Sequence, residues 1–108
     1  MLTQFIDIFK YLNYYMDVMN KSAEEIFKAL GNDTRLSIVK LLLKKGGLSC
    51  QQIQKHFPLS QPTMSHHFTW LVDTGVIKVK KEGASHLYSL NQERLEKNGI
   101  YLNRGGEK

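Results

Sequence analysis

The sequence contains a single cysteine, Cys50, and no long apolar run. One cysteine excludes a disulfide within the chain and a zinc site built from two or more cysteines of one chain. A membrane-spanning helix needs ~18 consecutive apolar residues, and Asp7, Lys10 and Asp17 interrupt the best candidate. The same charges are unlike an export signal, in which basic residues precede an unbroken apolar stretch. We therefore expect a cytoplasmic protein that does not contact a membrane.

The sequence also lacks the motifs that enzymes use. It has no glycine-rich phosphate loop, no paired carboxylates and no nucleophile beside an evident base. Its 108 residues are 42% hydrophobic and 23% charged, which is typical of one globular domain with a small core. We therefore expect a single domain over residues 1–108 that is not an enzyme. A domain of this size often gains stability by forming a dimer.

Basic residues are concentrated in the middle of the chain. The sequence has 15 lysines and arginines against 10 aspartates and glutamates, a net charge of +5. Residues 31–90 carry eight of the basic and three of the acidic residues, whereas residues 1–30 have a net charge of −1. A basic segment with less basic flanks favours a polyanionic partner, most often a nucleic acid. Solubility alone is the alternative explanation.

A helical period runs through residues 2–20. Apolar side chains recur on one side at three- and four-residue spacing, and others occupy the opposite side. The simple interpretation is a buried helix. A domain this small has little core to cover both sides, so we predict that residues 1–20 form a dimerisation helix. The predicted contacts across the dimer are Phe5, Phe9, Leu12, Tyr14, Tyr15, Met16 and Met19.

A second long helix is predicted from residue 33 to about residue 45. Asn32 or Asp33 caps its N-terminus, and the glycines at 46 and 47 end it. Its predicted inward residues are Leu36, Val39, Leu42 and Leu43, with Ile38 at the edge.

Two shorter helices follow. Ser49 and Gln52 have capping-box spacing and open a helix over roughly residues 49–57. Ser60 is the predicted N-cap of the next helix, with Pro62 in its first turn, where the missing N–H costs nothing. This helix runs to about residue 74. Two helices joined by so tight a turn form a helix-turn-helix, here residues 49–75.

After Gly75 the period changes from that of a helix to that of a strand. Ile77 and Val79 share one face of the strand, and a glycine-containing turn leads to a return strand. Residues 76–90 thus predict a two-stranded hairpin, and residues 91–108 a last helix and tail. The predicted fold class is mainly α (α+β), a winged helix-turn-helix with a two-stranded β-hairpin wing and an N-terminal dimerisation helix.

The outward face of the helix over residues 60–74 is polar and uncharged. At 100° per residue, Met64, Phe68 and Leu71 face the core, and hydroxyl groups and His66 lie opposite, with no acidic residue among them. A helix selected only for solubility would carry Glu and Lys on that face. Ser, Thr and His can reach base edges or phosphates, so this face suits a DNA major groove.

Several ordered motifs resemble the ArsR/SmtB-type bacterial regulators. Their recognition-helix signature resembles residues 59–68, LSQPTMSHHF. The helix junction before their central helix resembles residues 29–36, ALGNDTRL, and the end of their wing matches residues 88–90, YSL. The resemblance covers roughly residues 23–90. It implies a winged-helix homodimer that represses promoters, with an effector often releasing it.

The resemblance also implies which side chains contact double-stranded DNA. The residues that match DNA-contacting positions of the family are Ser60, Gln61, Thr63, Ser65 and His66. The exposed helix face and the hairpin tip add the predicted contacts Thr69, Lys80, Lys81 and Ser85. A two-fold dimer presents its recognition helices to one side of the duplex, so we expect an operator with inverted half-sites.

Metal sites of the family's known kinds are not expected. Many members hold metal through a Cys-x-Cys pair on the helix before the recognition helix, and Ser49 and Gln51 stand at those positions. A second family site uses Asp and His on the last helix, and residues 91–102 contain neither. The lone thiol of Cys50 makes a poor soft-metal site. We therefore predict no metal and no cofactor.

Two alternatives stay open on the sequence alone. One adds a non-standard metal or thiol sensor, built from Cys50 and histidines across subunits, with the Cys50 pKa lowered by the helix N-terminus. The other is a winged helix that binds a protein, which would present an apolar or acidic face.

Among the remaining side chains, His67 is expected at the core edge with a hydrogen bond. Trp70 is expected to pack beneath the wing, with DNA contact as the alternative.

Overall fold

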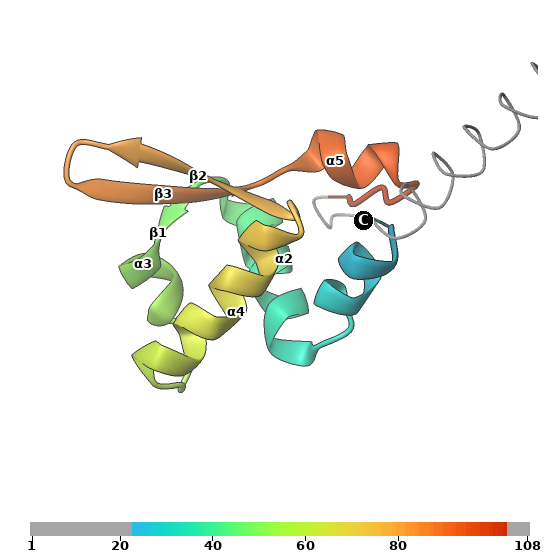
Figure 1. The fold of residues 1–108 in the computed structure, drawn as a ribbon. Coiled ribbons are helices and arrows are strands. Elements are labelled where there is room, and N and C mark those ends of the chain that lie inside the picture. The colour runs from blue at the N-terminus through green and yellow to red at the C-terminus, as the bar shows by residue number, and fades with distance from the viewer. Residues whose placement is uncertain (1–22, 104–108) are drawn as a thin grey trace, which may run out of the picture.

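The computed structural model describes residues 23–103, which form five helical segments and three short strands (Figure 1). Residues 23–30 are helical. The elements that follow are α2 (Asp33–Lys45), β1 (Leu48–Ser49), α3 (Cys50–Gln54), α4 (Gln61–Asp73), β2 (Ile77–Glu82), β3 (Ser85–Leu90) and α5 (Gln92–Lys97). The predicted mainly α fold with a hairpin wing is therefore confirmed. No helix within residues 23–103 is both long enough and apolar enough to cross a membrane.

The predicted dimerisation helix lies outside the described residues. The same is true of every side chain assigned to the dimer contact, namely Phe5, Phe9, Leu12, Tyr14, Tyr15, Met16 and Met19.

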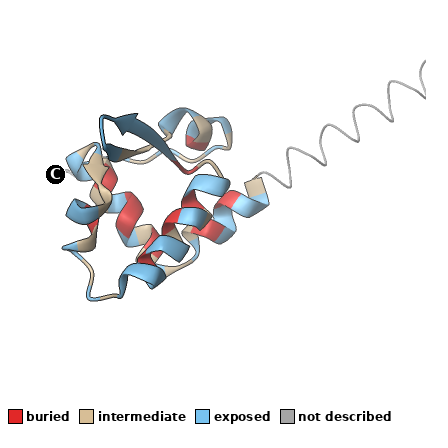
Figure 2. Ribbon diagram, turned by 60° about the vertical axis from the view of Figure 1, so that its left-hand side comes forward, coloured by how far each residue is buried: buried red, intermediate tan, exposed pale blue. Residues whose placement is uncertain are grey.

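The core lies where the helix at residues 23–30, α2 and α4 meet beneath the wing (Figure 2). Met64 and Leu71 of α4 are fully buried, and Phe68 is 5% exposed, as the helical period predicts. The prediction for α2 was wrong in detail, because Ile38 is fully buried whereas Leu36 and Leu43 are only half-buried. The inward stripe of α2 is thus turned by about one residue, and it begins with a charged side chain, Arg35.

The sheet has three strands, where the sequence predicted two. The order is β1-β3-β2, with both pairs antiparallel. Leu48 and Ser49 of β1 pair with Tyr88 and Leu87 of β3. Two residues are too few to show an alternating pattern, so β1 had no signal in the sequence. The pairing ties the start of the helix-turn-helix directly to the wing.

Local caps define the helix-turn-helix. Ser49 Oγ accepts from the Gln52 N–H at 3.2 Å, and Gln52 Oε1 accepts from the Ser49 N–H at 2.9 Å, which confirms the capping box. Ser60 caps α4 by accepting from the Thr63 N–H at 3.3 Å. Helix α3 ends at Gln54, three residues earlier than predicted, and the Gln54 carboxamide donates to the Leu59 carbonyl across the turn.

The glycine after α4 carries a steric constraint that the hairpin glycine does not. Gly75 and Gly83 have positive φ, +81° and +61°, so both favour glycine. A Cβ on Gly83 would meet nothing within 4 Å, whereas a Cβ on Gly75 would lie 2.4 Å from Cδ and Nε of Arg94. The Arg94 Nε donates to the Thr74 carbonyl at 2.9 Å, so the side chain cannot move aside without breaking that bond.

We expect Gly83→Ala to lower the free energy of unfolding by about 1–2 kcal/mol, the cost of left-handed backbone for a residue with a Cβ. Gly75→Ala should cost roughly 1 kcal/mol more, because the Arg94 hydrogen bond is broken as well. Urea unfolding of the two variants beside the parent chain measures both values. Equal destabilisation by the two substitutions would show that the Arg94 side chain can move away from position 75 without a loss of stability.

Candidate nucleic-acid interface

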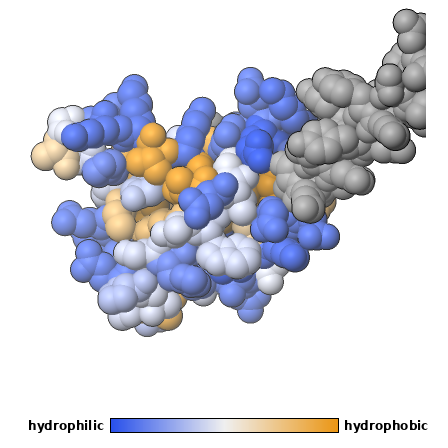
Figure 3. Space-filling model, in the orientation of Figure 1, coloured by the Kyte–Doolittle hydropathy of each residue, from blue (hydrophilic) through white to orange (hydrophobic). Residues whose placement is uncertain are grey.

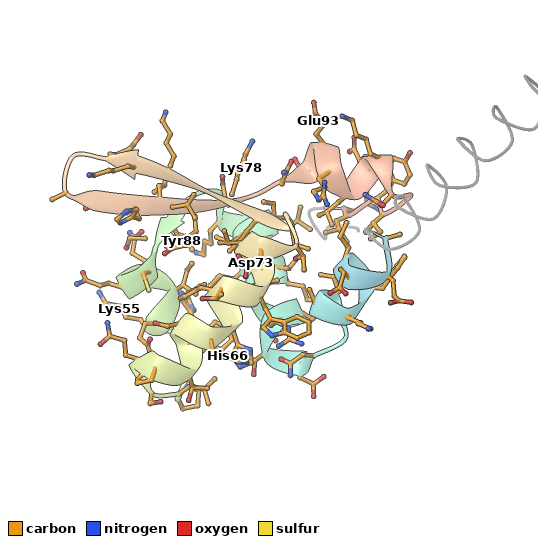
Figure 4. All side chains as sticks on the ribbon, viewed as in Figure 1. Lys55, His66, Asp73, Lys78, Tyr88 and Glu93 are labelled. Atoms are coloured by element: carbon orange, nitrogen blue, oxygen red, sulfur yellow. The ribbon has the colours of Figure 1, made fainter. Side chains whose placement is uncertain are left out.

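Helix α4 turns a polar face outward from its N-terminus to Thr69. The five residues of α4 predicted to contact DNA are exposed, and these are Gln61, Thr63, Ser65, His66 and Thr69. The N-cap residue, Ser60, is exposed as well. The first turn of α4 has no acidic residue, and Asp73 lies at the opposite end of the helix (Figure 4). No carboxylate in the first turn therefore opposes an anion at the positive end of the α4 dipole.

The polar groups on this face divide into those used within the fold and those left unpaired. Ser60 Oγ donates to Thr63 Oγ1 at 2.9 Å, so both hydroxyls belong to the cap. Thr69 Oγ1 donates to the Ser65 carbonyl at 2.9 Å. The hydroxyl of Ser65 has no hydrogen-bond partner within residues 23–103, and neither do the ring nitrogens of His66. These two side chains keep their full hydrogen-bonding capacity for a ligand.

The register of the wing places its two adjacent lysines on opposite faces. Lys81 pairs across the hairpin with His86, and Val79 pairs with Tyr88, so these four share the face turned toward α4. Lys80 lies on the other face beside Glu82, with 3.6 Å between its ammonium and the carboxylate. Figure 4 shows Lys78, which shares the face of Lys80, pointing away from the helices. Both tip lysines are exposed.

Ser85, the last predicted contact, is exposed and opens β3 opposite Glu82. Directly opposed residues of an antiparallel pair share a face. Ser85 therefore lies on the face of the wing that carries Lys80.

An open groove of about 370 Å³ runs between α4 and the wing. Figure 3 shows apolar side chains gathered there between hydrophilic margins, and Phe68, Val72, Val79 and Tyr88 line it. The rings of Phe68 and Tyr88 stack with centroids 5.0 Å apart and planes inclined by 20°. Tyr88 thus holds the wing at a fixed distance from α4, a role that its position in the sequence did not reveal.

A buried arginine, which sequence reasoning missed, supports the inner side of α4. Arg35 is 9% exposed, and its guanidinium lies 4.3 Å from the centre of the Trp70 ring. Trp70 was expected to pack beneath the wing, and its ring is instead covered by Arg35. His67 has the expected hydrogen bond, 3.4 Å from its Nδ1 to Arg35 Nη1. Burial, and then the charges of Arg35 and His66, lower the pKa of His67 below its ordinary value.

The residues at the family's cysteine-pair positions do not fit a soft metal. Ser49 is committed to capping α3, and Gln51 is an exposed carboxamide. No group of three or more His, Cys, Asp or Glu side chains is placed to hold a metal ion within residues 23–103. Burial raises the pKa of the Cys50 thiol, opposite to the lowered pKa that the thiol-sensor alternative needs.

Comparisons with known proteins agree with this architecture. A family model described as a helix-turn-helix domain matches residues 30–80. The arsenical resistance operon repressor of Staphylococcus xylosus is 39% identical over 84 residues, which cover 78% of this chain and 76% of that protein. The crystal structure of an ArsR family transcriptional regulator has a TM-score of 0.64 at 25% identity, over 71% of this chain and 78% of that one.

A further structural neighbour supports the fold alone. It is the solution structure of a homodimeric winged helix-turn-helix DNA-binding domain from Mycobacterium bovis. Its TM-score is 0.68 at 23% identity, over 76% of this chain and 75% of that one.

The capped helix pair, the polar outer face of α4 and the hairpin beside it define a winged helix-turn-helix DNA-binding domain. The chain belongs to the ArsR family. It is therefore a DNA-binding transcriptional regulator, which confirms the resemblance seen in its sequence.

The raised pKa of Cys50 predicts a slowly reacting thiol. Only the thiolate is nucleophilic, so a pKa above the ordinary 9.0 leaves little reactive form at neutral pH. We expect iodoacetamide to alkylate the folded protein more slowly at pH ~7 than it alkylates the urea-unfolded chain. The rate should rise steeply as the pH approaches and passes 9. Cys50 is the only cysteine, so mass spectrometry reports this site alone. Faster alkylation of the folded protein would instead favour a thiol sensor.

Proposed function

We propose that this protein is a homodimeric repressor that binds an operator with inverted half-sites, without the metal sites usual in its family. The observation that carries the proposal is the outer face of α4, where Ser65 and His66 are exposed and have no partner within the described chain. A major groove offers donors and acceptors that such groups can pair with. A protein-binding winged helix would present apolar or acidic groups there, whereas the N-terminal half of this face carries neither, and Val72 and Asp73 lie at its C-terminal end.

Base reading and phosphate anchoring fall to different parts of the interface. Ser65 and His66 read bases, since they lie exposed in the N-terminal half of α4 with unpaired polar atoms. Lys81 holds phosphate, because it is exposed on the wing face turned toward α4. Lys80 contributes less, because its ammonium is directed to Glu82 on the opposite face.

The proposed dimer uses the apolar N-terminal segment together with exposed apolar residues of the described chain. Phe27 is 56% exposed and Tyr101 is 74% exposed, so both side chains are accessible to a partner. Phe27 belongs to the helix that follows the N-terminal segment. The homodimeric state of the Mycobacterium bovis neighbour is consistent with this proposal.

The arsenical resistance repressor supports repression as the direction of control. An arsenical effector is not proposed for this chain, because Ser49 and Gln51 offer no thiolate pair.

The operator can be found by capturing fragmented genomic DNA with the purified protein and sequencing the bound fraction. Recovery of one or a few sites with two-fold symmetry supports the proposal, and uniform recovery of the genome contradicts it.

Replacing His66 by Ala should weaken operator binding by about 1–3 kcal/mol and leave binding to random DNA nearly unchanged. Replacing Lys81 by Ala should weaken both alike and lower the salt slope by about one unit for each phosphate that the lysine neutralises. Each change occurs twice in a dimer, so the effects can double. Affinities on operator and random duplexes across a salt series give these values.

Lys80→Ala is the matched control, since it removes the same charge one residue away on the opposite face of the wing. It should change the salt slope less than Lys81→Ala does. Equal slopes for the two lysine variants, or equal weakening of operator and random binding in the His66 variant, would refute this division of roles.

Deleting residues 1–20 should abolish the dimer, because the deletion removes the apolar stripe assigned to the interface. Sedimentation velocity of the truncated protein should show monomers or aggregates, against a dimer for the full chain. A truncated protein that sediments as a stable dimer would show that the interface lies outside residues 1–20.

A further inference from the structure

Arg35 is the single charged side chain that is buried within residues 23–103. No carboxylate within that range pairs with it. A buried charge normally requires a counter-charge or several well-placed hydrogen bonds. The neutral partners of Arg35 must therefore supply its stabilisation, and they come from two different helices.

The first helix is the one at residues 23–30. Arg35 Nε donates to the Ala29 carbonyl at 2.7 Å, and Nη2 donates to the Lys28 carbonyl at 3.4 Å. Both carbonyls lie in the last turn of that helix, where C=O groups run out of intrahelical N–H partners. The Lys28 carbonyl also accepts from the Gly31 N–H at 3.2 Å, so the shorter Ala29 bond is the main contribution of Arg35 to this end. A guanidinium at this end also meets the negative pole of the helix dipole. Arg35 thus caps the helix from a position on α2.

The second helix is α4, which packs on the other side of the guanidinium. The Trp70 ring stacks on it at 4.3 Å, and the Nδ1 atom of His67 lies 3.4 Å from Nη1. Arginine can only donate hydrogen bonds, so Nδ1 of His67 must be the acceptor. This hydrogen bond therefore requires a neutral imidazole that carries its proton on Nε2.

We propose that Arg35 is a positioning residue that fixes α4 relative to the helix at residues 23–30, and that its hydrogen bond to α4 forms only while His67 is neutral. This inference rests on the proposed function, in which α4 enters the DNA. The helix at residues 23–30 directly follows the predicted dimerisation segment. Its placement against α4 therefore sets how far apart the two recognition helices of a dimer lie, which operator binding requires and random binding does not.

Protonation of His67 would place a second cation against the guanidinium. The charged and titratable groups that act on His67 are Arg35 from α2 and His66 from α4. The helix at residues 23–30 contributes only carbonyls to this cluster, since the Lys28 ammonium lies 3.4 Å from Glu24. The pKa of His67 is below 6.5 in the folded protein. Stability from the Arg35–His67 contact is therefore fully present above the unfolded pKa of histidine and is lost as the pH falls through the lower folded value.

Trp70 is the only tryptophan in the chain, so its emission reports on this cluster without DNA. Three full-length proteins are compared: the parent, His67→Asn and Arg35→Lys. Asn keeps an acceptor oxygen near the position of Nδ1 and does not titrate. The parent emission should change between pH ~7.5 and ~5, with a midpoint below 6.5. The His67→Asn emission should stay constant over that range.

The second readout is affinity for operator and for random DNA. A single ammonium cannot serve two carbonyls, a ring and His67 at once, so Arg35→Lys keeps the charge and loses the geometry. We expect it to lower operator affinity by about fivefold or more, within the usual range of coupling between sites, and to leave random binding nearly unchanged. From pH ~7.5 to ~5.5 the parent should lose operator affinity about fivefold relative to His67→Asn. His66 is present in both proteins, so the comparison isolates the effect of replacing His67.

All assays are run at a temperature where each variant is folded by circular dichroism. Parent-like operator affinity in Arg35→Lys, or a pH response of His67→Asn equal to that of the parent, would overturn the inference and leave the proposed function standing. A parent protein that binds operator and random DNA equally would overturn the proposed function, and this inference with it.

Discussion

Burial of one apolar stripe on α4 is the interaction on which the outward surface of this helix depends. Met64 and Leu71 are fully buried, and Phe68 stacks on Tyr88. Burying a side chain of this size contributes roughly 1.5–3 kcal/mol, so rotating the helix out of register is costly. A rotation by one residue, about 100°, would carry polar side chains into the core. The same contacts that stabilise the domain therefore determine which side chains of α4 face outward, with His66 among them.

The wing is held to the helices by the middle strand of the sheet. β3 pairs with β1 on one side and β2 on the other, and its Tyr88 reaches down to α4. Since β1 ends at the residue that caps α3, the start of the helix-turn-helix and the base of the wing form one unit. The strand register then decides which lysine of the tip faces the groove. Wing and recognition helix can thus meet one DNA duplex in a fixed relation, because both are anchored to the same sheet.

Sequence reasoning succeeded where the determinants are local. The caps at Ser49 and Ser60 depend on side chains three residues apart, and the buried face of α4 follows from its period, so both could be predicted. The strand β1 could not, because it consists of two residues whose partners lie far along the chain. The burial of Arg35 was equally out of reach, since an arginine near the start of a helix is normally exposed. Only the tertiary structure places the Ala29 carbonyl and the Trp70 ring against the Arg35 guanidinium.

The two helices of the helix-turn-helix, α3 and α4, lack the end charges that α2 and α5 carry. Helix α2 begins with Asp33 and ends with Lys44 and Lys45, and α5 likewise has an acid in its first turn and bases in its last. Both patterns compensate the helix dipole, typically by 0.3–1 kcal/mol per charge. Helix α4 has no acid in its first turn and no base in its last, and its one carboxylate, Asp73, lies at the unfavourable end. No side-chain charge in its first turn thus compensates the positive pole at the N-terminus of α4. A DNA phosphate would complement that pole, so the uncharged first turn of α4 agrees with the proposed interface.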